Sequence, residues 1–343
     1  MIARFPKNDK LQKDMENRFI KISGAEIGQR LDKILSNRLR FPRPYIKNQI
    51  KKGIILVNKK SAKPGYALKK NDIISFEKFA LHAENIEKSE ILPNPDIKFK
   101  IIYEDRKIIV IDKPAGISVH PRSDKNGLPL KVETQNTLVS GLLAHYPLLK
   151  EVGEEPKIRP GIVHRLDKDT SGVMIIAKDN DSFQYLKEQF QNKTAQKKYL
   201  ALVVGRLKQK KGTICAFITR SIKDPTKQRI VTDYQLTTKL YKKVREAITE
   251  YEIIEEFKNF SLIEARPLTG RMHQIRLHFA SIGHPIAGDK KYSPKRTPIP
   301  KGLSRQFLHA AYLKIKLPGG KLKEFKSDLS DDLKTTLEIL PKV

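Results

Sequence analysis

The chain has 343 residues, which is long enough for two domains that bury a sizeable core. Lysine and arginine outnumber aspartate and glutamate by 68 to 38, and the formal net charge of +30 favours a polyanionic partner, nucleic acid above all. The sequence lacks a membrane-spanning apolar run and a secretory signal, and its single cysteine, Cys215, excludes a disulfide framework and a thiolate zinc site. We therefore expect a cytoplasmic protein without a membrane or metal partner, and a monomer because its charge opposes self-association.

The N-terminal part of the chain carries the strongest charge bias. Residues 1–17 are polar and predict a disordered tail, and residues 18–79 predict a small domain. Between Arg18 and Lys70 there are 15 basic and two acidic residues, a net charge of +13. Such a density of positive charge indicates contact with an RNA backbone, whereas the alternative is an ordinary solvated surface.

The elements expected in this small domain are two helices and a sheet. Apolar residues at helical spacing predict a helix over residues 27–39, and Pro44 and Gly53 bound a second helix. Short β-branched runs at 54–57 and 73–76 predict strands. The basic residues proposed as RNA contacts on these elements are Arg30, Arg43, Lys47, Lys51, Lys52, Lys59 and Lys60.

A change of composition marks the next boundary. Residues 80–96 lose periodicity and contain three glutamates and two prolines, so they predict a linker to a domain over residues 97–343. The run IIYEDRKIIVIDKPAGISVHP, residues 101–121, predicts a strand, a turn at 104–106, a second strand and a turn at 113–116. Residues 124–135 form a polar insertion of undetermined structure, and residues 137–144 predict a helix.

The centre of the chain is RPGIVHRLDKDTSGVMIIAKD, residues 159–179. Two apolar runs, 161–163 and 173–177, flank a polar segment, and both predict short buried strands. Residues 169–172, Asp-Thr-Ser-Gly, have the composition of a tight turn between them.

Because Asp169 fills the acidic position of this turn, Asp167 is a carboxylate that the turn does not need. Arg165 and Lys168 stand beside it, and nearby positive charge favours the ionised form of a carboxylate. An ionised carboxylate suits a nucleophile or a base better than an acid. The alternative is that Asp167 only caps the turn.

Further helix and strand patterns follow the central segment. Phe183, Leu186 and Phe190 predict an amphipathic helix, and residues 197–204 predict a strand that contains Tyr199. Residues 219–229 predict a basic loop suited to gripping an RNA backbone.

The later part of the chain predicts two more strands, at 249–257 and 260–265, and a helix from Gly270 to Gly283. His273 and His278 are five residues apart, so they cannot chelate one metal as an i, i+4 pair would.

Several of these segments resemble one family. HRLDKDTSG, residues 164–172, resembles the signature of the RluA-type pseudouridine synthases, which isomerise uridines in large-subunit ribosomal RNA. Residues 266–289 and the run Phe-Leu-His-Ala-Ala at 307–311 resemble further motifs of the same family. GQRLDKIL and the strands after it resemble the α-L RNA-binding domain of a ribosomal small-subunit protein, which often precedes the catalytic domain. The resemblance covers roughly residues 18–317.

The resemblance implies a fold and a set of roles. The fold would be α+β, with a mixed, mainly antiparallel sheet and flanking helices, plus the small N-terminal α-L domain. Asp167 would be the catalytic carboxylate and Tyr199 would stack on the target base. Arg276 would be the basic partner of Asp167, and Arg271 would be an RNA contact or the alternative partner. Leu308 would form an apolar floor beneath the uracil. The remaining role is that of Arg165, which would fill the gap left by the extruded base.

The resemblance also implies a reaction without a cofactor, because the isomerisation involves no redox step and loses no group. We expect no metal, and the substrate would be large-subunit ribosomal RNA, free or in an assembling subunit. The alternatives are a synthase acting on tRNA and a non-catalytic ribosome-assembly factor. A two-carboxylate glycosidase would need a second acid, and a protein kinase would need a Gly-rich loop and a DFG motif that this sequence lacks.

Overall fold

In the computed structural model the chain divides into two compact units, one of Met1–Ile97 with His120–Pro160 and one of Lys98–Val119 with Gly161–Val343. The structure describes residues 19–22, 24–39, 41, 43–76, 91–122, 134–224, 226–231 and 243–343. The predicted tail and most of the predicted linker and polar insertion lie outside the described residues. The predicted domain limits stay predictions.

The first unit contains the expected helices and small sheet. After the one-turn helix η1 (Gly24–Glu26), helices α2 (Leu31–Leu39) and α3 (Arg43–Lys51) pack on an antiparallel sheet of order β1-β4-β2-β3. The strands are β1 (Phe19–Lys21), β2 (Ile55–Val57), β3 (Lys60–Ser61) and β4 (Ile73–Phe76). The helical spacing works as predicted, because Leu31, Leu35, Ile46 and Ile50 all lie in one buried cluster. Helix α5 (Leu138–His145) and the 3-10 helix η4 (Pro147–Glu151) complete the unit.

The second unit is built on a ten-stranded sheet with the order β10-β9-β11-β12-β8-β13-β7-β6-β5, with β14 paired to β13. All described pairs are antiparallel except β7 with β13, so the predicted mixed, mainly antiparallel sheet and the α+β class are confirmed. The strands are β5 (Lys100–Glu104), β6 (Ile108–Lys113), β7 (Ser171–Ala177), β8 (Gln196–Val204), β9 (Lys211–Arg220), β10 (Gln228–Val231), β11 (Arg245–Phe257), β12 (Phe260–Pro267), β13 (Leu308–Lys316) and β14 (Leu322–Lys326).

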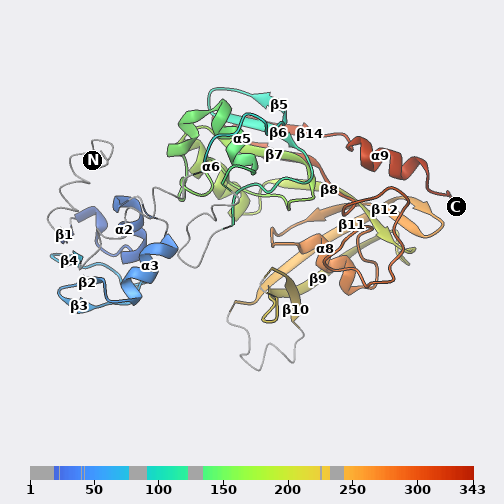
Figure 1. Cartoon of the computed structure of the whole chain (residues 1–343). Helices are drawn as coiled ribbons and strands as arrows, with labels where there is room; N and C mark the ends of the chain where they lie inside the picture. Colours follow the sequence, from blue (N-terminus) through green and yellow to red (C-terminus); the bar gives the residue numbers. More distant parts are fainter. Residues whose placement is uncertain are drawn as a thin grey trace. The chain divides into compact units, whose positions relative to one another are not determined.

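Two helices pack on this sheet, and a third follows its last strand in the chain. Helix α6 (Asn180–Gln191) packs on β7 and β13, and α8 (Gln274–Ser281) packs on β9 to β12 (Figure 1). Helix α6 begins where the Asp179 carboxylate accepts a hydrogen bond from the Ser182 amide at 2.7 Å. Helix α9 (Asp331–Glu338) buries Leu333. In the part of the chain that the structure describes, no helix is long and apolar enough to cross a membrane.

The structure corrects the prediction of a strand at residues 161–163. This segment makes one isolated bridge, between Ile162 and Ile176, instead of a strand. The neighbouring Ile175 amide donates to Nε2 of His164 at 3.0 Å, and the His164 ring stacks on Phe190 at 4.4 Å. A side chain thus occupies the place where a strand ladder would continue.

The start of the helix predicted from Gly270 also differs, because α8 begins at Gln274. His273 has a left-handed backbone with φ of 58°, which a continuous right-handed helix does not allow. The Gln274 side chain instead accepts from the Thr269 hydroxyl and the Arg271 amide, and so fixes the turn before the helix. The predicted basic loop is also shorter, because β9 continues to Arg220 and β10 begins at Gln228.

Candidate active site

Asp167 lies in an irregular segment immediately before strand β7, near the middle of the second unit's sheet. Its side chain is 20% exposed, and its Oδ2 accepts a hydrogen bond from Nη1 of Arg276 at 2.8 Å. Arg276 lies on α8 and its side chain is 8% exposed. Arg271, the alternative partner, donates from Nε to the Glu246 carbonyl at 3.1 Å. The arginine that contacts Asp167 is therefore Arg276.

A second carboxylate, Asp289, fixes the orientation of Arg276. Its two oxygens accept from Nε and Nη2 of Arg276 at 2.7 and 2.8 Å, and its side chain is fully buried. Burial would lower the pKa of Arg276, but the hydrogen bonds to Asp289 and the charge of Asp167 raise it, so the guanidinium stays charged. No role for Asp289 was predicted, because its contact with the Arg276 side chain, 13 residues earlier, follows no local sequence pattern.

A buried lysine hydrogen-bonds the backbone of the turn after Asp167. Lys113, at the end of β6, has no exposed surface, and its Nζ donates to the carbonyls of Pro114, Ile117 and Lys168 at 2.7, 2.9 and 3.1 Å. Burial lowers the pKa of Lys113 to about 7, against the opposing charges of Asp169 and Asp167. The lysine thus ties the turn after β6 to the residue that follows Asp167. Sequence reasoning identified this turn and gave its lysine no role.

Tyr199 and Leu308 form the apolar side of the site. Tyr199 lies on β8, between Ala265 of β12 and Ala310 of β13, and packs against a core cluster that contains Leu308. Leu308 begins β13 and is 4% exposed. Burial, and then the charge of Asp167, raise the pKa of Tyr199, so its hydroxyl stays protonated. An aromatic ring packed on a buried apolar cluster therefore lies near the carboxylate.

The remaining predicted residue near the site is Arg165, which is exposed two positions before Asp167. On the other side of Asp167 lies His273, whose Nε2 is 3.8 Å from Oδ1 and whose Nδ1 is 2.7 Å from the Tyr292 hydroxyl. Sequence reasoning considered His273 only as a metal ligand and did not identify Tyr292. Among the described residues, no group of three or more histidine, cysteine or acidic side chains could hold a metal ion.

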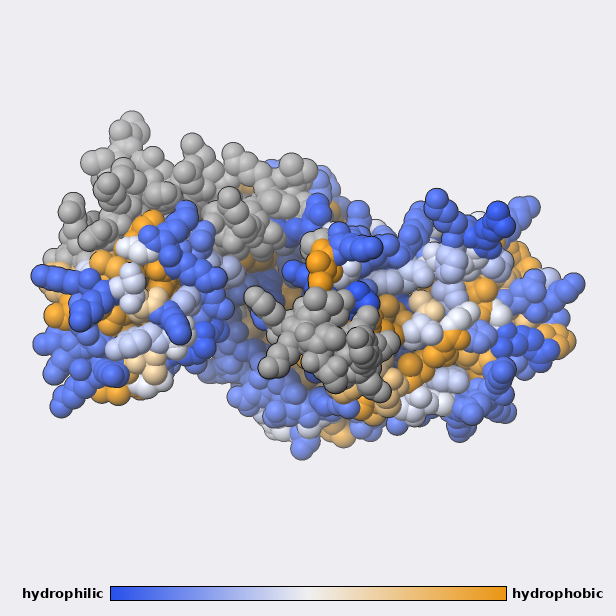
Figure 2. Space-filling view, turned by 90° about the horizontal axis from the view of Figure 1, so that it is seen from below, coloured by the Kyte–Doolittle hydropathy of each residue, from blue (hydrophilic) through white to orange (hydrophobic). Residues whose placement is uncertain are grey.

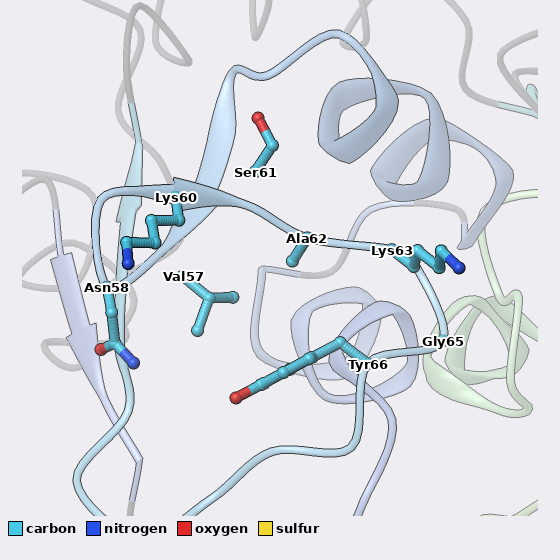
Figure 3. Close-up of a pocket in the computed structure, with 8 residues that line it drawn as sticks. All are labelled: Val57, Asn58, Lys60, Ser61, Ala62, Lys63, Gly65 and Tyr66. Carbon is cyan, nitrogen blue, oxygen red and sulfur yellow. The ribbon is translucent and has the colours of Figure 1, made fainter.

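The basic residues predicted in the first unit fall into two groups. Arg30, Arg43 and Lys47 surround the fully buried carboxylate of Asp32, at 3.0, 3.1 and 3.5 Å. The other four lie at the surface, namely Lys51, Lys52, Lys59 and Lys60. Lys60 also lines a hollow beside β2 and β3, together with Asn58, Lys63 and Tyr66 (Figure 3).

Chemically, the site offers one partly exposed carboxylate held by a permanent cation, beside an aromatic ring that packs on a buried apolar cluster. The second carboxylate in contact with Arg276, Asp289, is not free, because both of its oxygens already accept from Arg276. This arrangement suits covalent or base chemistry at one carboxylate and not two-acid glycoside hydrolysis.

The chain belongs to the RNA pseudouridylate synthase family, whose model matches residues 107–281, and it contains an S4 domain at residues 29–74. It is therefore an isomerase that acts on RNA. An uncharacterised RNA pseudouridine synthase of Bacillus subtilis (strain 168), YlyB, is 34% identical over 94% of this chain and 98% of the relative. Ribosomal large subunit pseudouridine synthase C of Escherichia coli (strain K12) is 32% identical over 94% of this chain and 96% of the relative.

Solved structures show the same fold. The human RNA pseudouridylate synthase domain containing 4 protein superposes with a TM-score of 0.52 at 24% identity, over 75% of this chain and 95% of that one. The expected membership of a pseudouridine synthase family and the expected N-terminal RNA-binding domain are therefore confirmed.

Proposed function

We propose that this enzyme isomerises specific uridines of large-subunit ribosomal RNA, with Asp167 as the catalytic carboxylate. The observation that carries the proposal is the 2.8 Å contact between Asp167 and Arg276, because it pairs a partly exposed carboxylate with a buried, permanently charged guanidinium. Relatives named for the ribosomal large subunit match 94% of this chain, which supports the choice of RNA. Asp167 acts either as a nucleophile on the ribose or as a base toward a ribose proton.

The other site residues complete the proposed chemistry. The target uridine leaves its helix, at a cost of a few kcal/mol of unstacking, and its base stacks on Tyr199 above Leu308. Arg165 fills the gap in the RNA stack. Bond cleavage, rotation of the uracil and rejoining through carbon need no electron carrier, so the proposed reaction uses no cofactor. In the same proposal the enzyme needs no metal and acts as a cytoplasmic monomer.

The first unit supplies RNA affinity in this proposal. Hydrophilic residues cover most of its visible surface (Figure 2). The four surface lysines, Lys51, Lys52, Lys59 and Lys60, contact phosphates, whereas Arg30, Arg43 and Lys47 present their remaining donors from the Asp32 cluster. Replacing the four lysines by alanine should flatten the salt dependence of RNA binding by roughly 0.7 to 0.9 in slope for each lost contact. An unchanged slope would show that these lysines face only solvent.

The substrate is tested by mapping pseudouridines in all stable RNA of a strain that lacks this gene. We expect positions in large-subunit ribosomal RNA to lose the modification, wild-type enzyme to restore it, and Asp167→Asn to leave it absent. Loss confined to tRNA would show that the substrate is tRNA. The same mapping on free RNA and on assembling subunits treated with purified enzyme identifies the form that is modified.

A further inference from the structure

His273 occupies the side of Asp167 that Arg276 leaves open. Arg276 binds Oδ2 of the carboxylate, and Nε2 of His273 lies 3.8 Å from Oδ1. The imidazole is held at its other nitrogen, where Nδ1 lies 2.7 Å from the hydroxyl of Tyr292. The His273 side chain is 10% exposed, so its two neighbours largely determine its orientation.

The direction of the hydrogen bonds can be deduced from one end of this chain of contacts. The backbone amide of Gln228, at the start of β10, lies 2.8 Å from the Tyr292 oxygen, and an amide can only donate. Burial raises the pKa of Tyr292 to about 12, so the phenol keeps its proton at neutral pH. Among the described residues, the acceptor within hydrogen-bond distance of that proton is Nδ1 of His273.

The protonation state of His273 then follows. Burial lowers the pKa of His273 to about 4, so the ring is neutral at pH 7 and carries one proton. Among the nearby charges, Asp167 and Asp289 raise the pKa of His273, whereas Arg276 and Lys291 lower it. If Nδ1 accepts from Tyr292, the single proton is on Nε2, the nitrogen that faces Asp167.

We propose that Tyr292 fixes His273 in the Nε2–H tautomer, and that His273 is thereby a positioning residue that holds Oδ1 of Asp167 while Arg276 holds Oδ2. The inference rests on the proposed catalytic role of Asp167. The 3.8 Å separation is longer than a hydrogen bond, and the proposal requires that it shorten when substrate binds, as catalytic contacts of unliganded enzymes often do. With the opposite tautomer a lone pair would face the carboxylate and repel it.

The same contacts reach the loop between β9 and β10. Gln228 ends this loop, and Nζ of Lys291, next to Tyr292, donates to the Thr226 carbonyl at 3.0 Å. The backbone amides of Lys291 and Tyr292 both donate to Oδ1 of Asp289. Tyr292 is therefore fixed by both the basic loop and the carboxylate that clamps Arg276.

Histidine tautomers give distinct ¹⁵N chemical shifts, which allows a test independent of activity. We expect the full-length enzyme, labelled with ¹⁵N-histidine, to show His273 as the Nε2–H tautomer at pH 7, with the signal assigned by its loss in His273→Gln. Tyr292→Phe should convert it to a mixture. Tyr103→Phe, which removes the hydrogen bond that a phenol on strand β5 donates to Asp105, should leave it unchanged. An Nδ1–H or doubly protonated His273 in the wild type would overturn the inference.

Kinetics test the consequence for Asp167. His273→Gln keeps an N–H donor and should lower the single-turnover rate at saturating RNA by roughly threefold, whereas His273→Leu, equally strained at its left-handed backbone, should lower it by at least about tenfold. RNA affinity should stay within about twofold for both. Equal losses in the two variants would overturn the positioning role. Full activity of Asp167→Asn would instead overturn the proposed function and leave the tautomer result standing.

Discussion

Asp289 holds Arg276 by two hydrogen bonds of 2.7 and 2.8 Å, and this clamp turns the remaining Nη1 toward Asp167. A guanidinium can serve two carboxylates in this way because its donors form a rigid planar fork. The buried carboxylate of Asp289 determines the orientation of the Arg276 guanidinium, and the guanidinium in turn holds the partly exposed carboxylate of Asp167. The arginine that holds Asp167 is itself only 8% exposed.

Arg276→Lys should abolish most activity, although it keeps the positive charge. An ammonium cannot make the bidentate contact with Asp289 and reach Asp167 together, so we expect a loss of about 3 kcal/mol of transition-state stabilisation, roughly a hundredfold in single-turnover rate. Arg271→Lys is the matched control and should cost less than about threefold. A damaging Arg271→Lys beside a mild Arg276→Lys would show that Arg271 is the functional partner.

The Asp289–Arg276 ion pair should contribute more to stability than the Asp332–Arg305 ion pair. Asp289 is fully buried against Arg276, so Asp289→Asn leaves the buried guanidinium with Asp167 as its one remaining carboxylate contact among those described, and should cost about 3 kcal/mol of unfolding free energy. Asp332, 47% exposed against Arg305, should cost at most about 1 kcal/mol when changed to asparagine. Urea denaturation of the two variants measures both values. Equal costs would contradict the clamp.

Gly172, the last residue of the HRLDKDTSG motif, should not tolerate alanine. Its φ is 118°, and a Cβ there would overlap the carbonyl oxygen of Ala310 on the parallel strand β13. Because neither backbone can move without breaking the sheet, we expect a loss of about 3 kcal/mol in stability. Gly116 also has a positive φ but open space around it, so Gly116→Ala should cost about 1 kcal/mol. Similar urea midpoints for the two variants would refute the steric argument.

The Asp32 cluster predicts a pH dependence in the first unit. Burial would raise the pKa of Asp32, but hydrogen bonds from Arg30 and Arg43 lower it to about 2. A carboxyl with a lowered folded-state pKa stabilises the fold above its unfolded value near 3.8, and this contribution is lost as pH falls toward 2. Asp32→Asn should therefore cost about 2 kcal/mol at pH 7 and progressively less between pH 4 and pH 2.

The stability difference between wild type and Asp32→Asn can be measured at each pH by hydrogen exchange of the amides in α2 and α3 of the full-length chain, corrected for intrinsic rates. A stability difference that stays constant over the whole pH range would show that the Asp32 charge contributes nothing. Lys33→Gln, a change at an exposed position of the same helix, controls for the loss of a charge alone.

Periodic segments were predictable from the sequence, and contacts between distant segments were not. Helix α6, with Phe183 and Leu186 buried, and strand β8, with Tyr199, follow directly from apolar spacing. The resemblance predicted that Arg276 would lie beside Asp167, and the two side chains are in contact. Their catalytic roles stay predictions.

The rest of the site depends on tertiary contacts that no local pattern encodes. Lys113 meets the carbonyl of Lys168 across 55 residues, and Asp289 is revealed only by the Arg276 side chain folded against it. The predicted start of α8 was too early because His273 has a left-handed backbone. Its side chain contacts Tyr292 and lies near Asp167, and helix propensity does not encode these tertiary neighbours.

The most direct test of the account is the single-turnover rate of pseudouridine formation by Asp167→Asn at saturating ribosomal RNA. The amide keeps the shape of the carboxylate but is neither nucleophile nor base, so we predict a rate below about 1% of wild type with RNA affinity within a few-fold. Asp169→Asn, two residues away in the turn, should stay within about fivefold of wild type. Retention of more than a few per cent of the wild-type rate by Asp167→Asn would contradict the assignment of the catalytic carboxylate.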